Sequence, residues 1–206
     1  MPTPSTHDHD HDDGHVIHLL PRLEAASPLV QAPEALAFPP RMRRTGRILF
    51  ALLNVIASAG AAWAIYLLWT DDTPGWWFNL IFTVMLGGLA LALWAVLSGS
   101  IRQAKREARL QTIWRGIAPR AVATGGRVSE RRWKLAEDGA VASFSLVVQI
   151  PGDRPICGHW RPTSSREQLL QTQVPGVGAE ARVWRAPNSA HQAPLVIEVA
   201  DPSVVS

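Results

Sequence analysis

The sequence predicts a membrane α + β protein, in which a two-helix transmembrane hairpin precedes a small β-barrel domain. Two observations lead to this prediction. Two uncharged apolar runs, at about 48–69 and 77–98, are separated only by a short polar turn. After residue 120 the helical periodicity ends, and short segments rich in β-branched and aromatic residues alternate with turns that contain Gly and Pro.

The chain before the hairpin, residues 1–40, is rich in proline and lacks a sustained apolar period, so we expect a disordered tail. Short apolar groups within it, around residues 16–20, 29–30 and 36–38, are candidate docking segments for a partner. Its first part carries potential ligands of zinc, nickel or copper: His7, Asp8, His9, Asp10, His11, Asp12, Asp13, His15 and His18. The fixed spacing of a structural zinc site is missing, so we expect a solvated tract and no bound metal.

The hairpin is expected to occupy residues 41–99. A helix rises about 1.5 Å per residue, so each run of roughly 20 residues can cross a hydrocarbon core of about 30 Å. Neither run contains Asp, Glu, Lys, Arg or His. The alternative is a pair of buried helices in a soluble domain, which so short a chain could hardly cover.

Basic residues flank the hairpin on both sides and are missing from its turn. They are Arg41, Arg43, Arg44 and Arg47 before it, and Arg102, Lys105, Arg106 and Arg109 after it. The turn carries Asp71 and Asp72. Because basic residues near span ends stay on the cytoplasmic side, we predict a multi-pass protein of the cell (inner) membrane with both termini cytoplasmic. No cleavable signal peptide is visible before the first span.

Small and polar side chains inside the two runs are the candidates for contacts between helices. They are Asn54, Ser58, Gly60, Ala62, Gly88, Ala92 and Ala95. Small residues let helix backbones approach closely in lipid, and a buried amide needs a hydrogen-bond partner. The sequence leaves two interpretations open. The small faces pack against each other within the hairpin, or one of them docks onto another membrane protein.

A basic amphipathic linker helix is expected at 100–119, where it either connects the domains or lies on lipid headgroups, and Pro119 ends it. Residues 120–200 follow as a β domain, with a short tail at 201–206. Strands are expected at 120–136, 141–150, 156–160, 181–185 and 195–199, with a short helix at 164–170 between the third and fourth. The order β-β-β-α-β-β resembles an OB-like small barrel.

Three tryptophans of the β domain, Trp133, Trp160 and Trp184, lie near basic residues and could be platforms for stacking bases. Packing in the core or at the rim explains them better, so we do not expect nucleic acid as a partner. Cys157 and His159 share a face of one strand and could form half a metal site or a nucleophile pair. Nothing in the sequence completes such a pair, so no catalytic, cofactor or metal residue is predicted, and we do not expect an enzyme.

The Arg-, Ala-, Pro- and Trp-rich composition resembles small two-span membrane proteins of high-GC actinobacteria. The layout is similar to that of accessory subunits of MCE-type lipid transporters. This resemblance implies a non-catalytic accessory or regulatory subunit whose partners are other integral membrane proteins and lipid headgroups. Two alternatives are a membrane-tethered module that binds a ligand or nucleic acid, and a metal-handling protein that uses its His/Asp tract.

Overall fold

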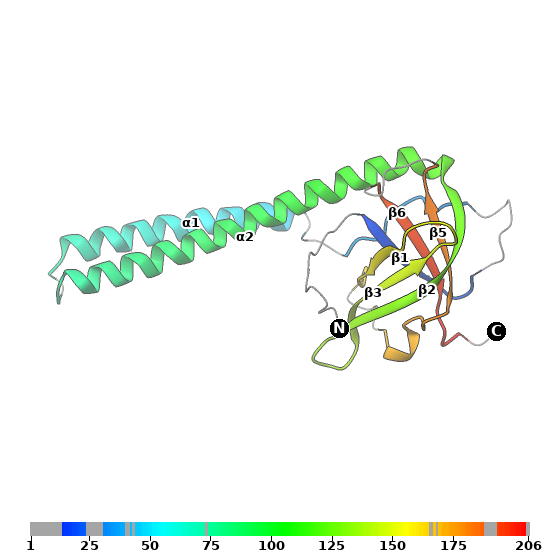
Figure 1. Ribbon diagram of the computed structural model, residues 1–206. Helices are drawn as coiled ribbons and strands as arrows, with labels where there is room; N and C mark the ends of the chain where they lie inside the picture. Colours follow the sequence, from blue (N-terminus) through cyan, green and yellow to red (C-terminus); the bar gives the residue numbers. More distant parts are fainter. Residues whose placement is uncertain are drawn as a thin grey trace. The chain divides into compact units, whose positions relative to one another are not determined.

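A computed structural model describes residues 14–23, 31–39, 42, 44–72, 74–164, 167, 169–187 and 193–204 (Figure 1). The chain divides into two compact units. One consists of Met1–Pro40 together with Glu107–Ser206, and the other consists of Arg41–Arg106. The first unit is therefore built from two stretches of the sequence, one that precedes the second unit and one that follows it.

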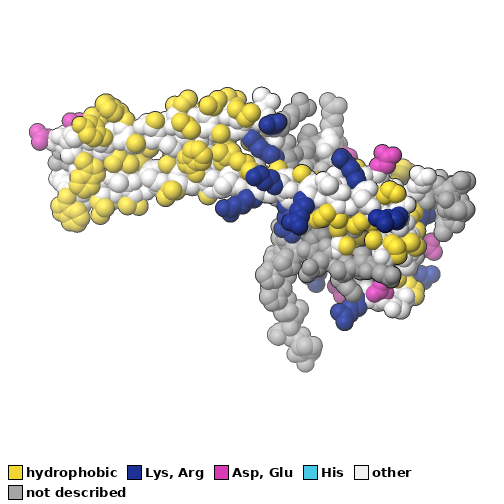
Figure 2. All heavy atoms as spheres, turned by 90° about the horizontal axis from the view of Figure 1, so that it is seen from above, with side chains coloured by type: hydrophobic (Ala, Val, Ile, Leu, Met, Phe, Trp, Pro, Cys, Tyr) yellow, Lys and Arg dark blue, Asp and Glu magenta, His cyan; other side chains and the backbone are white. Residues whose placement is uncertain are grey.

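The second unit is a helical hairpin. Its helices are α1 (Arg44–Thr70) and the greater part of α2 (Trp76–Ile117), and they contain both predicted spans. Both helices are long and apolar enough to cross a membrane. In each helix, only 6% of an apolar segment of 18 residues is buried within the protein, whereas the core helix of a soluble protein is mostly buried. Apolar side chains are spread along the visible surface of the hairpin, and Lys and Arg side chains gather at one of its ends (Figure 2).

The predicted linker helix at 100–119 is the uninterrupted continuation of α2, which ends at Ile117. A single turn of 3₁₀-helix, η1 (Ala118–Arg120), follows and contains Pro119 in its first turn. Proline lacks the N–H that a further α-helical turn requires. The prediction that Pro119 ends the helix is therefore confirmed.

The first unit is a closed barrel (Figure 1). The five predicted strands are found as β2 (Val122–Leu135), β3 (Val141–Gln149), β4 (Ile156–Trp160), β5 (Glu180–Arg185) and β6 (Leu195–Ala200). The long β2 pairs with β5 through its first part and with β3 through its second part. Around the barrel the order is β1-β4-β3-β2-β5-β6, and β1 closes it.

The strand β1 (His15–Leu20) corrects the prediction that residues 1–40 form a disordered tail. It runs parallel to β6 over its full length and pairs with β4 where Val16 lies opposite His159. Val16 and Ile17 are both buried, although neighbouring strand residues point to opposite faces. A strand covered on both faces shows no polar–apolar alternation, which explains why the sequence pattern did not indicate it.

The OB-like assignment is not confirmed. An OB-fold is a five-stranded barrel, whereas this barrel has six strands and β1 is parallel to both of its neighbours. In the region of the helix predicted at 164–170, Leu169 forms a β-bridge with Val141, and a turn of 3₁₀-helix, η2 (Gln171–Gln173), follows. Residues 165, 166 and 168 of that predicted helix lie outside the described part of the chain.

Two apolar clusters stabilise the barrel unit. One fills the interior, where a Cβ added to Gly158 would lie 2.6 Å from Ile197 Cδ1 and 3.1 Å from Ile17 Cγ1, so that these two side chains would have to shift. The other lies outside, where the last turns of α2 and the segment around Leu36 cover β1, β5 and β6. This cluster contains Trp114, which is fully buried and donates from Nε1 to the carbonyl oxygen of Pro33 at 2.8 Å.

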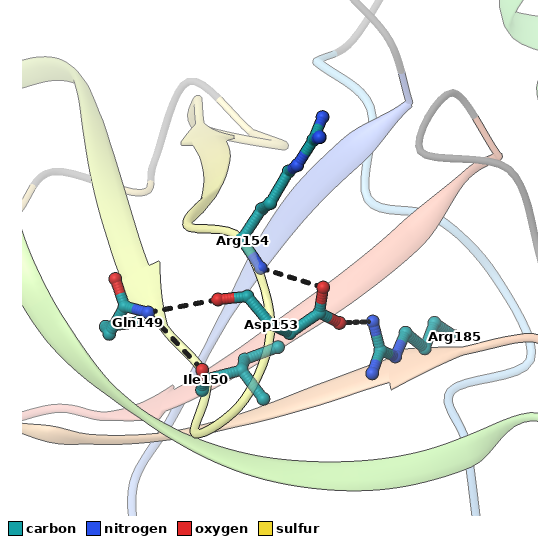
Figure 3. A network of polar contacts seen from close by, with 5 residues as sticks. All are labelled: Gln149, Ile150, Asp153, Arg154 and Arg185. Atoms are coloured by element: carbon teal, nitrogen blue, oxygen red, sulfur yellow. Dashed lines mark hydrogen bonds and ion pairs between the residues drawn. The ribbon is translucent and has the colours of Figure 1, made fainter.

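The turn between β3 and β4 is fixed by polar contacts around Asp153 (Figure 3). The Asp153 carboxylate forms an ion pair with Arg185 at the end of β5 and accepts a hydrogen bond from the backbone N–H of Arg154. Gln149 Nε2 donates to the carbonyl oxygens of Ile150 and Asp153. Gly152 has a φ of 76°, a conformation that glycine adopts without strain. These contacts hold the turn against β5.

Candidate functional site

The interface between α1 and α2 is closed by side-chain hydrogen bonds. Asn54 is 1% exposed and donates from Nδ2 to the carbonyl oxygen of Leu93 at 3.2 Å. Trp94 Nε1 donates to Ser58 Oγ at 3.0 Å, and Trp69 Nε1 donates to Thr83 Oγ1 at 3.1 Å. Such bonds stabilise helix pairs in lipid, where apolar burial between helices contributes little. Asn54 and Ser58 therefore act within the hairpin.

The other small residues predicted for helix contacts are not buried in this interface. Gly60 and Ala62 of α1 and Gly88, Ala92 and Ala95 of α2 are all exposed. A Cβ built on Gly60 or Gly88 would meet nothing within 4 Å. The two small faces therefore do not pack against each other, and the first of the two interpretations left open by the sequence is wrong for these five residues.

Four of the small positions on α2 form one continuous stripe, which we call the α2 stripe: Gly88, Ala92, Ala95 and Gly99. At 100° per residue they lie within about 60° of one another, on the side of α2 opposite Asn79 and Leu97. Asn79 and Leu97 are buried, at 6% and 4% exposure, and mark the side that faces α1. The α2 stripe is therefore the side of the helix most distant from α1.

The three tryptophans of the β domain do not share a surface. Trp160 is buried in the barrel, where its ring stacks on Phe144 with centroids 5.1 Å apart. Trp184 is buried in the outer cluster. Trp133 is 39% exposed, with the Arg131 guanidinium 4.8 Å from its ring centroid. Only one of the three rings is thus accessible to a base, and the set does not form a stacking platform.

A row of ionisable groups on the outer face of the barrel was missed by sequence reasoning. Strand register places His18 of β1 opposite Glu198 of β6, and Glu198 opposite Arg182 of β5. Arg182 and Glu198 form a buried ion pair with Nη1 and Oε2 3.3 Å apart, and Trp184 Nε1 donates to the same carboxylate at 2.8 Å. Burial lowers the pKa of His18, which favours its neutral form at neutral pH. The one feature of the sequence that could have indicated this row is Glu198, an acidic residue within the otherwise apolar strand β6.

Cys157 and His159 lie on the outer face of β4, as their spacing predicts, with Sγ and Nε2 3.8 Å apart. Burial raises the pKa of the Cys157 thiol; the nearby Arg132 guanidinium lowers it and the Glu130 carboxylate raises it further. The thiol is therefore protonated at neutral pH and is not an activated nucleophile.

The His/Asp tract at residues 7–13 lies outside the described residues. Within the described part of the chain, no group of three or more His, Cys, Asp or Glu residues could hold a metal ion.

Comparison of the chain with protein-family models finds no match, and neither a curated protein nor a solved structure matches it.

Proposed function

We propose that the chain is a non-catalytic accessory or regulatory subunit of a larger inner-membrane complex. In this proposal the hairpin spans the membrane and docks onto another integral membrane protein through the α2 stripe. The barrel unit lies at the cytoplasmic surface, where it contacts the same complex.

The observation that carries the proposal is the outward orientation of the small residues. Gly88 and Ala92 are exposed on the side of α2 opposite its contact with α1, and the hairpin is closed without them by the hydrogen bonds of Asn54 and Trp94. A face of small residues lets a second helix approach closely, which is how helices associate in lipid. The hairpin thus has a free face whose side chains suit another transmembrane helix.

The construction of the barrel supports a hairpin with both ends on one side of the membrane. β1 precedes α1 in the chain, whereas β2–β6 follow α2, and all six strands share one sheet. A barrel can close only if its strands are on the same side of a bilayer. The Arg and Lys residues next to both ends of the hairpin favour the cytoplasmic side.

The resemblance in layout to accessory subunits of MCE-type lipid transporters suggests one class of partner. If the partner is such a transporter, the chain would stabilise or regulate lipid import without acting on lipid chemically. The identity of the proteins that co-purify with the chain decides this finer part of the proposal.

Replacing two residues of the α2 stripe by leucine, in the double variant Gly88→Leu/Ala92→Leu, is expected to release the partner. Extra methylenes in a close-packed contact cost about 1–3 kcal/mol, so recovery of the partner should fall by about 10-fold or more. The measurement is affinity purification of the tagged full chain from native membranes in mild detergent, with quantification of the co-purified membrane proteins.

The matched control is Ala59→Leu, an exposed alanine of α1 that lies outside the stripe; it should retain the partner. Recovery of the wild-type chain alone as a monodisperse monomer would count against the proposal. So would a double variant that retains its partner as well as the control does.

A further inference from the structure

The end of the hairpin away from its turn carries positive charge that the hairpin unit does not balance. Within residues 41–106 every basic residue precedes Ile48 or follows Ser100 in the sequence: Arg41, Arg43, Arg44, Arg47, Arg102, Lys105 and Arg106. The only acids of that range, Asp71 and Asp72, lie in the turn at the other end, and Glu107, the next acid along α2, can offset one charge at most. Lys and Arg side chains are seen together at one end of the hairpin in Figure 2.

The first turn of α1 adds to this positive potential. It contains Arg44 and Arg47 and no acidic residue. The first four N–H groups of a helix lack partners within the helix, and the helix dipole places about half a positive charge there, so this position favours acids and disfavours cations. Arg47 Nε is buried and has no hydrogen-bond partner within the described part of the chain. An anion bound at this turn would reverse the unfavourable electrostatics and supply the missing acceptor.

The basic residues of α2 lie at the same level of the hairpin as this turn. The hydrogen bond between Asn54 and Leu93 fixes the register of the two antiparallel helices. Arg47 is seven residues before Asn54, about 10 Å along α1 at 1.5 Å per residue. Arg102 is nine residues after Leu93, about 14 Å in the same direction along α2, and Lys105 follows one turn later. Cations of both helices therefore form one layer.

Apolar surface begins directly beside this layer. Ile48 and Leu49, which follow Arg47 in α1, are exposed, and so is Ile101, which precedes Arg102 in α2. An inorganic anion or the carboxylate of a partner protein would use only the cations. A phospholipid with an anionic headgroup would use both the cations and the apolar side chains, and an anionic leaflet attracts basic residues next to a span. Lipid is therefore the ligand that fits this end of the hairpin best.

We propose that this end of the hairpin binds an anionic phospholipid, whose phosphate lies at the first turn of α1 against Arg44 and Arg47. Its acyl chains lie along the exposed apolar side chains that follow, and Arg102 and Lys105 add positive charge from α2. Arginine suits the phosphate because its guanidinium can donate two parallel hydrogen bonds to one such group. The inference rests on the part of the proposed function that places the hairpin in the membrane, and it does not depend on docking through the α2 stripe.

The test is native mass spectrometry of the purified full chain in mild detergent, after addition of dioleoylphosphatidylglycerol or of dioleoylphosphatidylcholine at the same concentration. The two lipids share their acyl chains, and only the first carries a net negative charge. We expect one bound phosphatidylglycerol, with an affinity about 10-fold or more above that for phosphatidylcholine. Inorganic phosphate in excess should not displace it, because phosphate cannot use the apolar surface.

The double variant Arg44→Gln/Arg47→Gln should bind phosphatidylglycerol about 30-fold more weakly, since each Lys or Arg at an anionic surface contributes about fivefold. Its binding of phosphatidylcholine should stay unchanged. The matched control, Arg115→Gln/Arg154→Gln, removes two exposed arginines of the barrel unit and should bind as the wild type does. Circular dichroism of both variants should match that of the wild type, which separates a lost contact from a lost fold.

The proposal is overturned if the two lipids bind equally, if no lipid is bound, or if inorganic phosphate displaces the lipid. It is equally overturned if the double variant binds phosphatidylglycerol as tightly as the wild type. A double variant that keeps the lipid but loses co-purified membrane proteins would assign the cations to a protein partner instead. Carbonate washing of membranes shows separately whether the chain is integral, so failure of the lipid site is distinguishable from failure of the membrane hairpin.

Discussion

Trp114→Ala is expected to lower the free energy of unfolding of the barrel unit by about 3–5 kcal/mol, the usual cost of removing a buried tryptophan. The indole is fully buried in the outer cluster, and its Nε1–H bonds to the carbonyl oxygen of Pro33. Alanine would open a cavity between α2 and the barrel and leave the Pro33 oxygen without this donor. Denaturant unfolding of the full chain in detergent, followed by circular dichroism in the β region, measures the loss.

The matched control is Ile113→Ala, one residue earlier on the same helix and 40% exposed. It should cost less than about 1 kcal/mol, because surface substitutions usually have small effects. Equal destabilisation by the two variants would mean that the end of α2 does not pack on the barrel as described.

Glu198→Gln is expected to cost about 3–5 kcal/mol, because the Arg182 charge stays buried while the opposite charge of its ion-pair partner is lost. The Arg182 and Glu198 side chains are 8% and 7% exposed. Glutamine keeps the size of the side chain and an oxygen that can accept the hydrogen bond from Trp184 Nε1. The lost free energy of unfolding therefore reports mainly the missing charge. The loss is measured by denaturant unfolding of the full chain in detergent, as for Trp114→Ala.

Two controls sharpen this test. Glu130→Gln removes the acid of an exposed pair, in which Arg132 lies 3.8 Å away with side chains 82% and 64% exposed, and it should cost about 0–1 kcal/mol. The double variant Arg182→Met/Glu198→Leu should recover much of the stability, since apolar replacement of a buried pair is often neutral. If Glu198→Gln proved no more harmful than Glu130→Gln, the pair would not be buried in solution.

The sequence was sufficient to predict the parts of this chain whose patterns are local. Two uncharged runs indicated α1 and α2, and turn signals such as 151–153 separated strands that the structure contains at nearly the predicted bounds. Because side chains two residues apart share a face of a strand, the sequence also predicted that Cys157 and His159 lie on one face of β4, and they do.

What could not be predicted depends on contacts between distant parts of the chain. His15–Leu20 shows no alternation because both of its faces are covered, and its partners β4 and β6 lie more than a hundred residues away. The burial of Trp184 depends on Glu198 and on the end of α2, which no spacing within β5 reveals. Nor does the sequence of one helix show whether a stripe such as Gly88–Gly99 faces its neighbour or the surroundings.

The most direct test of a membrane hairpin with both ends in the cytoplasm is cysteine labelling in cells, on the full chain carrying Cys157→Ser. Single cysteines are placed before α1 (Arg22→Cys), in the turn (Asp72→Cys) and after β6 (Val204→Cys); all three residues are exposed. A membrane-impermeant maleimide should label the cysteine at 72 in intact spheroplasts, and those at 22 and 204 only after permeabilisation. Labelling of the cysteines at 22 and 204 from opposite sides, or of all three from the same side, would contradict the hairpin.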